Sequence, residues 1–282
     1  MKSAAFNFIS PALLLNALEL QTQYPNYSKF LGGGQSMGPM LNLRLAQPDQ
    51  LVSLQRIAGL KAHRLQESKL FLGALTTHAQ IEDKVVPDVT QGFMPYVAAN
   101  IAYRAIRNQG TLGGSLCHAD PAADWVSTMM VLDATVHMSR LGANGNMETR
   151  HMAVSDFMLG AFTTEIHEDE ILTNISISAF PPDAHWGYYK ICQKPGEFAR
   201  SIAAVLSIES LGVHRIVVGA THSKPILIND AKPLLHSCDK GAIQVTLREH
   251  GLEADDFEFQ NHVTAVIRAI RMASMPHSDP HH

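Results

Sequence analysis

The sequence predicts an α+β fold organised in about two domains. Strand-like and helix-like patterns follow one another along the whole chain, and no internal repeat is present. The 282 residues correspond to about 1.9 domains at roughly 150 residues per domain. Apolar residues make up 46% of the chain and charged residues 17%, a composition typical of a globular protein that excludes the disordered and fibrous classes.

Short strands and helices alternate in the first half of the sequence. Alternating side chains at 6–9 predict a strand, and Ser10 followed by Pro11 is typical of an N-cap and a first helical position, so we expect a helix to follow directly. Further elements are predicted as strands at 27–31, 51–54 and 70–75, a helix from 76–78 to 84, and an Ala-rich helix over 93–108 that stops before Gln109-Gly110.

Helices and strands also alternate in the second half of the sequence. The patterns there predict a helix at 124–132, a strand at 134–139, a turn at 141–147 and a strand at 171–179. Pro181-Pro182 then indicates a domain boundary or hinge. Beyond it we expect a strand at 187–194, a hairpin of 203–210 with 213–219, helices at 243–250 and 262–272, and a frayed tail at 275–282.

Charge and cysteine content exclude several classes of protein. Lys and Arg total 22 against 26 Asp and Glu, a net charge of −4 that offers no basic field for nucleic acid. Cys117, Cys192 and Cys238 are too widely spaced for a disulfide framework, a four-thiolate zinc site or a self-contained iron–sulfur cluster. Polar residues interrupt the N-terminal Leu run, so we expect no signal peptide, no membrane span and a cytoplasmic location.

Two glycine-containing segments, GGGQS at 32–36 and TLGGS at 111–115, are the strongest functional signal. Glycines can present bare backbone N–H groups in a concave nest that binds phosphate oxygens, and each segment also carries a hydroxyl. Two such nests could clamp a pyrophosphate, whereas the alternative interpretation is a pair of tight turns. Neither segment has the Rossmann or Walker spacing.

The runs FLGGGQSMGPMLNLRLAQPDQLVSL and IRNQGTLGGSLCHADPAAD resemble the FAD-binding medium subunit of molybdenum hydroxylases. This family includes the medium chain of carbon monoxide dehydrogenase and the flavin domain of xanthine dehydrogenase, and the resemblance extends from Phe6 to Met272. It implies a two-subdomain FAD-binding domain of the vanillyl-alcohol-oxidase/PCMH type at 1–177, with subdomains of about 1–55 and 56–177. A small α+β domain, of the carbon monoxide dehydrogenase flavoprotein C-terminal type, would occupy 178–282.

The resemblance also implies a set of FAD-binding residues. Two groups would surround the diphosphate: Leu31, Gly32, Gly33, Gly34, Gln35, Ser36, Met37 and Gly38, and Thr111, Gly113, Gly114 and Ser115. Ile101 would line the flavin, Leu172 would lie beside the adenine portion and Phe198 against the isoalloxazine ring. Asp124 and Lys190 would be further contacts to the cofactor. Without the resemblance, Asp124 would be interpreted as a helix N-cap, Ile101 and Leu172 as core, Lys190 as a solvated charge and Phe198 as packing.

What the resemblance implies for function is an oxidoreductase subunit that transfers electrons. It would take electrons from the [2Fe-2S] clusters of a small subunit, within a dimer of heterotrimers whose large subunit holds the molybdenum cofactor. It would pass them to a small-molecule acceptor, with NAD, a quinone, a cytochrome and oxygen all left open. We expect no catalytic residue and no metal ligand in this chain. The alternatives are a scaffold of this fold without cofactor and a stand-alone flavin oxidase.

The glycine segments, an acidic run and a His–Asp cluster each carry one further expectation. A bulky residue at Gly33 or Gly113 is expected to abolish FAD retention by blocking the backbone approach, whereas a mere turn would lose only stability. The acidic patch of Glu165, Glu168, Asp169 and Glu170 is interpreted as a solvated turn. His118, Asp120 and Asp124 are interpreted as a local cluster without a metal.

Overall fold

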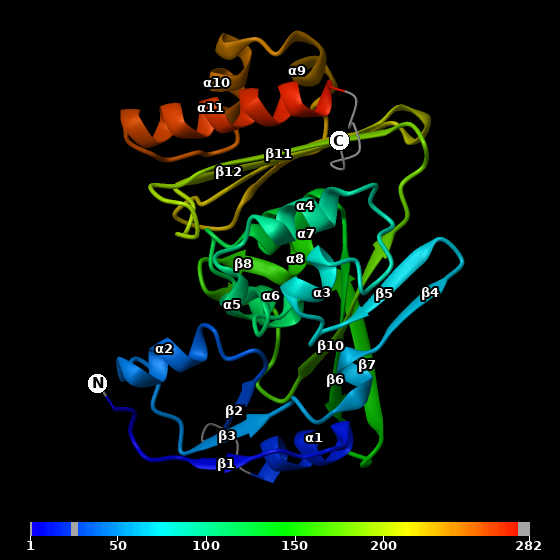
Figure 1. Ribbon diagram of the computed structural model, residues 1–282, viewed down its shortest axis with the longest axis vertical. Coiled ribbons are helices and arrows are strands. Elements are labelled where there is room, and N and C mark those ends of the chain that lie inside the picture. Colours follow the sequence, from blue (N-terminus) through cyan, green and yellow to red (C-terminus); the bar gives the residue numbers. More distant parts are fainter. Residues whose placement is uncertain (1, 24–27, 276–282) are drawn as a thin grey trace.

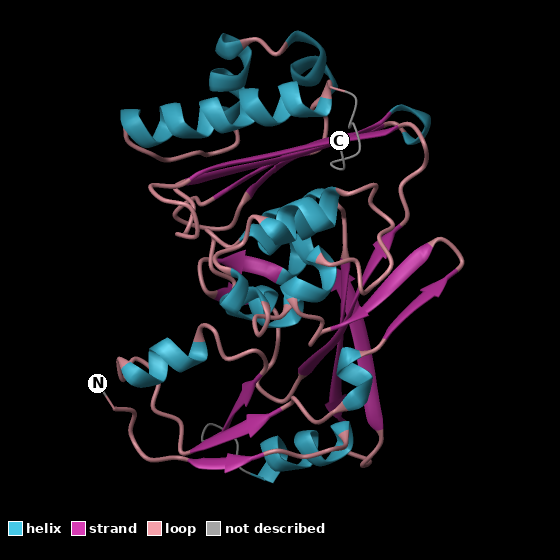
Figure 2. Cartoon of the chain, in the orientation of Figure 1, coloured by secondary structure: helices cyan, strands magenta, loops and turns pink. Residues whose placement is uncertain are grey.

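The protein is described by a computed structural model that covers residues 2–23 and 28–275. Figure 1 shows three layers stacked along the long axis: a small sheet with the N-terminus, a central body, and a larger sheet beneath C-terminal helices. Figure 2 shows that strands and helices are mixed in every layer, as an α+β sequence predicts.

The N-terminal layer is a three-stranded parallel sheet in the order β1-β3-β2. Its elements are β1 (Asn7–Ile9), α1 (Leu14–Gln23), β2 (Ser28–Leu31), α2 (Met37–Asn42) and β3 (Gln50–Ser53). The predicted cap at Ser10 is wrong, because the first helical bond runs from the Ala17 N–H to the Leu13 carbonyl and the helix begins only at Leu14. Tyr27, predicted to start the next strand, lies outside the described residues.

The central body is an antiparallel five-stranded sheet, β4-β5-β10-β6-β7, with helices on one face. Its first elements are the 3₁₀ turn η1 (Ala58–Lys61), β4 (His63–Gln66), β5 (Lys69–Gly73), α3 (His78–Glu82), α4 (Phe93–Ala99), α5 (Arg104–Arg107) and α6 (Leu112–His118). The rest are α7 (Asp124–Val131), β6 (Thr135–Leu141), β7 (Met147–Ala153), α8 (Val154–Phe157), β8 (Met158–Gly160), β9 (Thr163–Thr164) and β10 (Ile171–Ser178).

The C-terminal layer is an antiparallel four-stranded sheet, β11-β12-β13-β14. Its elements are β11 (Ala184–Ile191), β12 (Ser201–Ile208), η2 (Glu209–Leu211), β13 (Val213–Gly219), β14 (Ile226–Ile228), α9 (Lys232–Ser237), α10 (Lys240–Glu249) and α11 (Asp256–Ala273). One face packs on the central body through Trp186 and Tyr188, and the other packs under α11 through Ala203 and Val205. The sheet is therefore buried on both faces.

Most of the predicted elements are confirmed within a few residues. The strand predicted at 187–194 lies three residues earlier, and residues 276–282 of the tail are outside the described part of the chain. The helix predicted over 93–108 is wrong as a single element, because it breaks into α4 and α5 around a loop at 100–103 in which Ala102 has φ of 40°. The segment at 111–115, predicted as a turn, is instead the first turn of α6.

Candidate functional site

A cavity of about 530 Å³ opens where the loop after β2 faces the helices of the central body. Most of the residues singled out in the sequence line it: Leu31, Gly32, Gly33, Gly34, Gln35, Ser36, Met37, Ile101, Thr111, Gly113, Gly114, Ser115, Asp124, Leu172 and Phe198. Gly38 and Lys190 are the two that do not. Segments from all three layers thus converge on one concavity.

The first glycine loop offers free backbone donors to this cavity. Its carbonyls are turned toward the protein, since the Gly32 oxygen accepts a hydrogen bond from Gln55 Nε2 (3.0 Å) and the Gly33 oxygen one from Gln35 Nε2 (3.4 Å). The amides of residues 33–36 have no acceptor among residues 2–23 and 28–275. Gly34 adopts φ of 73°, which a glycine tolerates without strain. Consecutive amides without an acceptor beside a cavity, with one residue at positive φ, are what an anion-binding nest requires.

The second glycine segment is built differently. The amides of Leu112 and Gly113 donate to the carbonyls of Thr76 and Ala74, both at 2.9 Å. The Gly114 amide donates to Thr111 Oγ1 (3.2 Å) and the Ser115 amide to the Thr111 carbonyl (3.0 Å), so Thr111 is the N-cap of α6. Its backbone donors are already used, and this segment presents hydroxyl groups rather than a second nest.

The two glycine segments also touch each other. A Cβ atom added to Gly33 would lie 2.1 Å from the Gln109 carbonyl oxygen, and one added to Gly113 would lie 2.7 Å from the Ala74 carbonyl oxygen. A Cβ on Gly32 would meet Thr111 Oγ1 at 3.3 Å. Gly33 and Gly113 are therefore required by contact with neighbouring backbone, which is a separate reason from the approach of a ligand.

Asp124 carries a buried charge on the cavity wall. It is the first residue of α7, and the N-cap is Ala123, so the interpretation of Asp124 as a cap is wrong. Its Oδ1 accepts from the Tyr188 hydroxyl (2.6 Å) and from Lys190 Nζ (2.8 Å). Burial, and to a smaller extent the negative charge of Asp124, raises the pKa of Tyr188 well above its usual value. The hydroxyl therefore stays protonated and acts as a donor.

Lys190 does not line the cavity but contacts residues that stand beside it or in its wall. Its ammonium group donates to Asp124 and also to the Asn100 carbonyl at 2.6 Å, and only 11% of its side chain is exposed. The solvated charge expected without the resemblance is therefore wrong for Lys190. Both donors to Asp124 come from β11, so the C-terminal sheet fixes this carboxylate.

Replacing Tyr188 with phenylalanine is expected to destabilise the fold by about 2 kcal/mol, because a hydrogen bond to a charged, buried group is lost. Chemical denaturation would measure the change. Tyr189→Phe is the matched control: Tyr189 is more exposed, and its hydroxyl has no hydrogen-bond partner within the described part of the chain. Equal stability of the two variants would contradict the role of the Tyr188 hydroxyl.

Apolar side chains form another part of the wall. Leu172 on β10 is 4% exposed and belongs to the core as well as the cavity, and Ile101 packs on the same core from the loop after α4. Phe198, in the loop between β11 and β12, also lines the cavity and is 68% exposed. A flat apolar group would therefore be covered on its inner side and accessible at its edge.

His78 and Glu170 are cavity residues that the sequence analysis missed. Trp125 Nε1 donates to His78 Nδ1 at 2.8 Å, and burial together with the charge of Arg107 lowers the pKa of His78 to about 4, so this ring is neutral. Thr77 and Gln80 form a capping box that starts α3 at His78, a signal the sequence does carry. Glu170 contradicts the interpretation of a solvated patch, since it is 3% exposed and paired with Arg150.

The wall suits a dinucleotide that contains a flavin. A nest of free amides with nearby hydroxyls from Thr111 and Ser115 fits a diphosphate, and apolar surface at Ile101, Leu172 and Phe198 fits ring systems. In the described part of the chain, no three His, Cys, Asp or Glu side chains come together as metal ligands. No helix there has the length and apolarity needed to cross a membrane.

Comparison with known proteins agrees with this geometry. Residues 4–179 match the family described as the FAD binding domain in molybdopterin dehydrogenase. The chain is 32% identical to the nicotine 6-hydroxylase medium subunit of Paenarthrobacter nicotinovorans over 247 residues, 85% of this chain and 83% of the relative. It is 31% identical to the carbon monoxide dehydrogenase medium chain of Hydrogenophaga pseudoflava over 208 residues, 73% of this chain and 70% of the relative.

Solved structures give the same result for the fold. A reconstituted CO dehydrogenase from Oligotropha carboxidovorans superposes with a TM-score of 0.85 at 27% identity, covering 97% of this chain and 99% of that chain. The predicted fold class is confirmed by this match together with the family match. The chain belongs to the family of FAD-binding medium subunits of molybdenum hydroxylases, and it is an oxidoreductase subunit.

Proposed function

We propose that this subunit binds one FAD in the cavity and transfers electrons between a partner and an external acceptor. The observation that carries the proposal is the loop at 32–36, whose amides at 33–36 have no acceptor in the described residues and which lines a cavity that also has apolar side chains in its wall. When bound, FAD supplies the redox chemistry, while the chain binds the cofactor, orients it and controls access to it.

The proposed contacts follow the wall of the cavity. The amides of residues 33–36 and the hydroxyls of Thr111 and Ser115 would hold the diphosphate. Leu172 would lie against the adenine portion, and Ile101 and Phe198 against the isoalloxazine ring. Asp124 would contact the cofactor directly, whereas Lys190 would orient Asp124. Gly38 does not line the cavity and serves the start of α2, where its amide bonds the Gly34 carbonyl.

The proposed partners follow from the names of the relatives. Medium subunits or chains of nicotine 6-hydroxylase and carbon monoxide dehydrogenase imply companion subunits. We propose a large subunit with the molybdenum cofactor and a small subunit with [2Fe-2S] clusters as electron donor, assembled as a dimer of heterotrimers. A small-molecule acceptor would take the electrons from the flavin. Cys117, Cys192 and Cys238 are free and lie in separate segments, consistent with clusters held elsewhere.

We also propose a division of the chain into 1–177 and 178–282, with the first part made of subdomains at about 1–55 and 56–177. The cut falls at the end of β10, before β11 begins the C-terminal sheet. The subdomain cut falls just after β3, the last strand of the N-terminal sheet. The cavity would then lie between the two subdomains.

Flavin content tests the proposal. The purified chain is expected to carry flavin absorbance and, after removal of the cofactor, to bind about one FAD per chain by calorimetric titration. ADP is expected to compete with FAD, and riboflavin to bind more weakly, because the diphosphate contacts are the ones formed by the nest. A folded chain that binds no flavin would instead be the scaffold without cofactor.

Co-purification separates the remaining alternatives. An electron-transfer subunit is expected to retain an iron–sulfur subunit and a molybdenum subunit when tagged and purified from its native cells. A chain that holds FAD, retains neither partner and reduces its flavin with substrate on its own would be a stand-alone oxidase, and this result would overturn the assignment.

A further inference from the structure

The loop at 100–103 is held by charged side chains from two other segments. It separates α4 from α5, and both Ile101 and Ala102 line the cavity. Three successive carbonyl groups accept hydrogen bonds: Asn100 from Lys190 Nζ (2.6 Å), Ile101 from Arg107 Nη1 (3.0 Å) and Ala102 from the same nitrogen (3.2 Å). The loop conformation therefore depends on two cations rather than on regular secondary structure.

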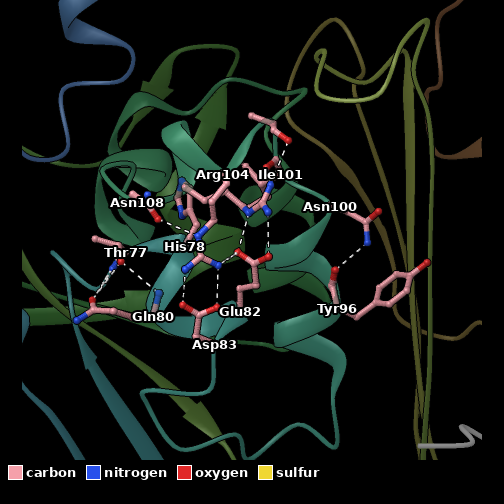
Figure 3. Close-up of polar contacts among 12 residues, drawn as sticks. Thr77, His78, Gln80, Glu82, Asp83, Tyr96, Asn100, Ile101, Arg104 and Asn108 are labelled. Atoms are coloured by element: carbon pink, nitrogen blue, oxygen red, sulfur yellow. Dashed lines mark hydrogen bonds and ion pairs between the residues drawn. The ribbon is translucent and has the colours of Figure 1, made fainter. Parts of the chain in front are cut away.

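Arg107 is in turn fixed by Glu82 at the end of α3. Its Nε and Nη2 donate to the two oxygens of the Glu82 carboxylate at 2.7 and 2.9 Å, a bidentate pair. Arg107 and Glu82 are 12% and 18% exposed, so this pair is better shielded from water than an ordinary surface ion pair. Figure 3 shows Glu82 among these contacts, with Ile101 on one side and Arg104 and Asp83 on the other.

The held conformation is one that the chain would not adopt unaided. Ala102 has φ of 40°, in the left-handed region that costs a residue with a Cβ about 1 kcal/mol or more. The amides of Asn100 and Ile101 donate to the carbonyls of Val97 and Ala98, which tightens the end of α4. A strained loop that faces a cavity persists only where its surroundings over-determine it.

We infer that Arg107, oriented by Glu82, is a positioning residue that sets the place of Ile101 against the bound flavin. The inference rests on the proposed function, since it assumes that FAD occupies the cavity. Arg107 does not itself line the cavity, and it acts through the carbonyls of the loop. A lysine at this position could not donate to both loop carbonyls and both Glu82 oxygens, because it lacks the planar fork of the guanidinium group.

The test compares Arg107→Met with Arg104→Met in the full chain. Arg104 is the matched control because it also pairs with Glu82 but donates to no loop carbonyl, bonding instead to Asp83 and Asn108. In the chain freed of FAD, Arg107→Met is expected to speed exchange of the hydrogen-bonded amides of Asn100 and Ile101 by about tenfold, and Arg104→Met to change it less than about twofold. This readout does not depend on cofactor binding.

Binding and spectroscopy form the second part of the test. The dissociation constant for FAD is expected to rise about tenfold in Arg107→Met, with a changed visible circular dichroism of the bound flavin, and to stay within about twofold in Arg104→Met. Arg107→Lys is expected to lie between Arg107→Met and the unmodified chain in both measurements. If Arg107→Met does not fold, the same two measurements are made on Arg107→Lys, with Arg104→Lys as its control.

The outcomes separate the inference from the proposed function. An unmodified chain that binds no FAD would overturn both, yet faster exchange in Arg107→Met would still show the hold on the loop. Faster exchange with unchanged FAD affinity and an unchanged flavin spectrum would overturn the positioning role alone. Equal behaviour of the Arg107 and Arg104 variants in all measurements would also overturn it.

Discussion

Replacing Gly33 with alanine is expected to destabilise the whole protein by roughly 3 kcal/mol or more, because the new methyl group collides with fixed backbone. Its Cβ would lie 2.1 Å from the Gln109 carbonyl oxygen and 2.9 Å from the Gly110 Cα. Neither neighbour is a flexible side chain that could move aside. The loop after β2 and the segment before α6 would have to separate, and with them the two sides of the cavity.

This expected result changes the interpretation of the glycine loop. From the sequence, a bulky residue at Gly33 is expected to abolish FAD retention by blocking the backbone approach, whereas a mere turn would lose only stability. The structure predicts that folding fails first. Urea denaturation with circular dichroism measures the stability, and Gly59→Ala is the control, since a Cβ there has nothing within 4 Å in the described residues. A Gly33→Ala protein with unchanged stability that binds no FAD would restore the original interpretation.

Acid is expected to unfold the protein through two buried histidines. Burial lowers the pKa of His78 to about 4, helped by the charge of Arg107, and burial lowers the pKa of His262 to about 4 despite the opposing charge of Glu258. The pKa of both side chains in the unfolded chain is about 6.5. Between pH 6.5 and 4 the unfolded state therefore binds more protons than the folded state. The stability that each contributes is complete above pH 6.5 and is lost as the pH falls toward 4, by up to about 3 kcal/mol per histidine.

His262→Asn isolates one of these contributions without touching the cavity. His262 lies on α11, where its Nδ1 is 2.9 Å from Ser201 Oγ. The variant is expected to be less stable at pH 7.5 but to lose less stability between pH 6.5 and 5, measured as urea midpoints across that range. His63→Asn serves as control, because His63 is exposed on β4. A His262 variant with the same pH dependence as the unmodified chain would contradict the buried, neutral imidazole.

Much of the fold could be predicted from local patterns. The strand at 171–179, the hairpin of β12 and β13, and α11 were found because their apolar residues repeat with the period of a strand or a helix. The exposed strand β4 was missed, because all four of its residues face solvent and carry no such signal. The break between α4 and α5 was missed because the loop's contacts depend on distant segments: Lys190 bonds the Asn100 carbonyl, and Arg107 is paired with Glu82.

The candidate site also has features that the sequence shows and features that depend on tertiary packing. The glycine segments and their chemistry were visible in the sequence, and the structure brings most of the named residues to one cavity. The difference between the two segments was not visible: both contain glycines and hydroxyls, but only the second has its amides used by Ala74 and Thr76. The role of Lys190 was also hidden, since its position beside Asp124 depends on how β11 packs against α7.

The hydrogen bonds from Tyr188 and Lys190 to Asp124 limit where the chain can be cut into independent parts. A fragment that ended after β10 would keep the nest and most of the cavity wall, but the Asp124 carboxylate would lose both of its donors. The Asn100 carbonyl would lose its partner as well. The cavity wall and the C-terminal sheet are thus structurally coupled, and a transplanted or recombined module that is to keep this wall intact has to include β11.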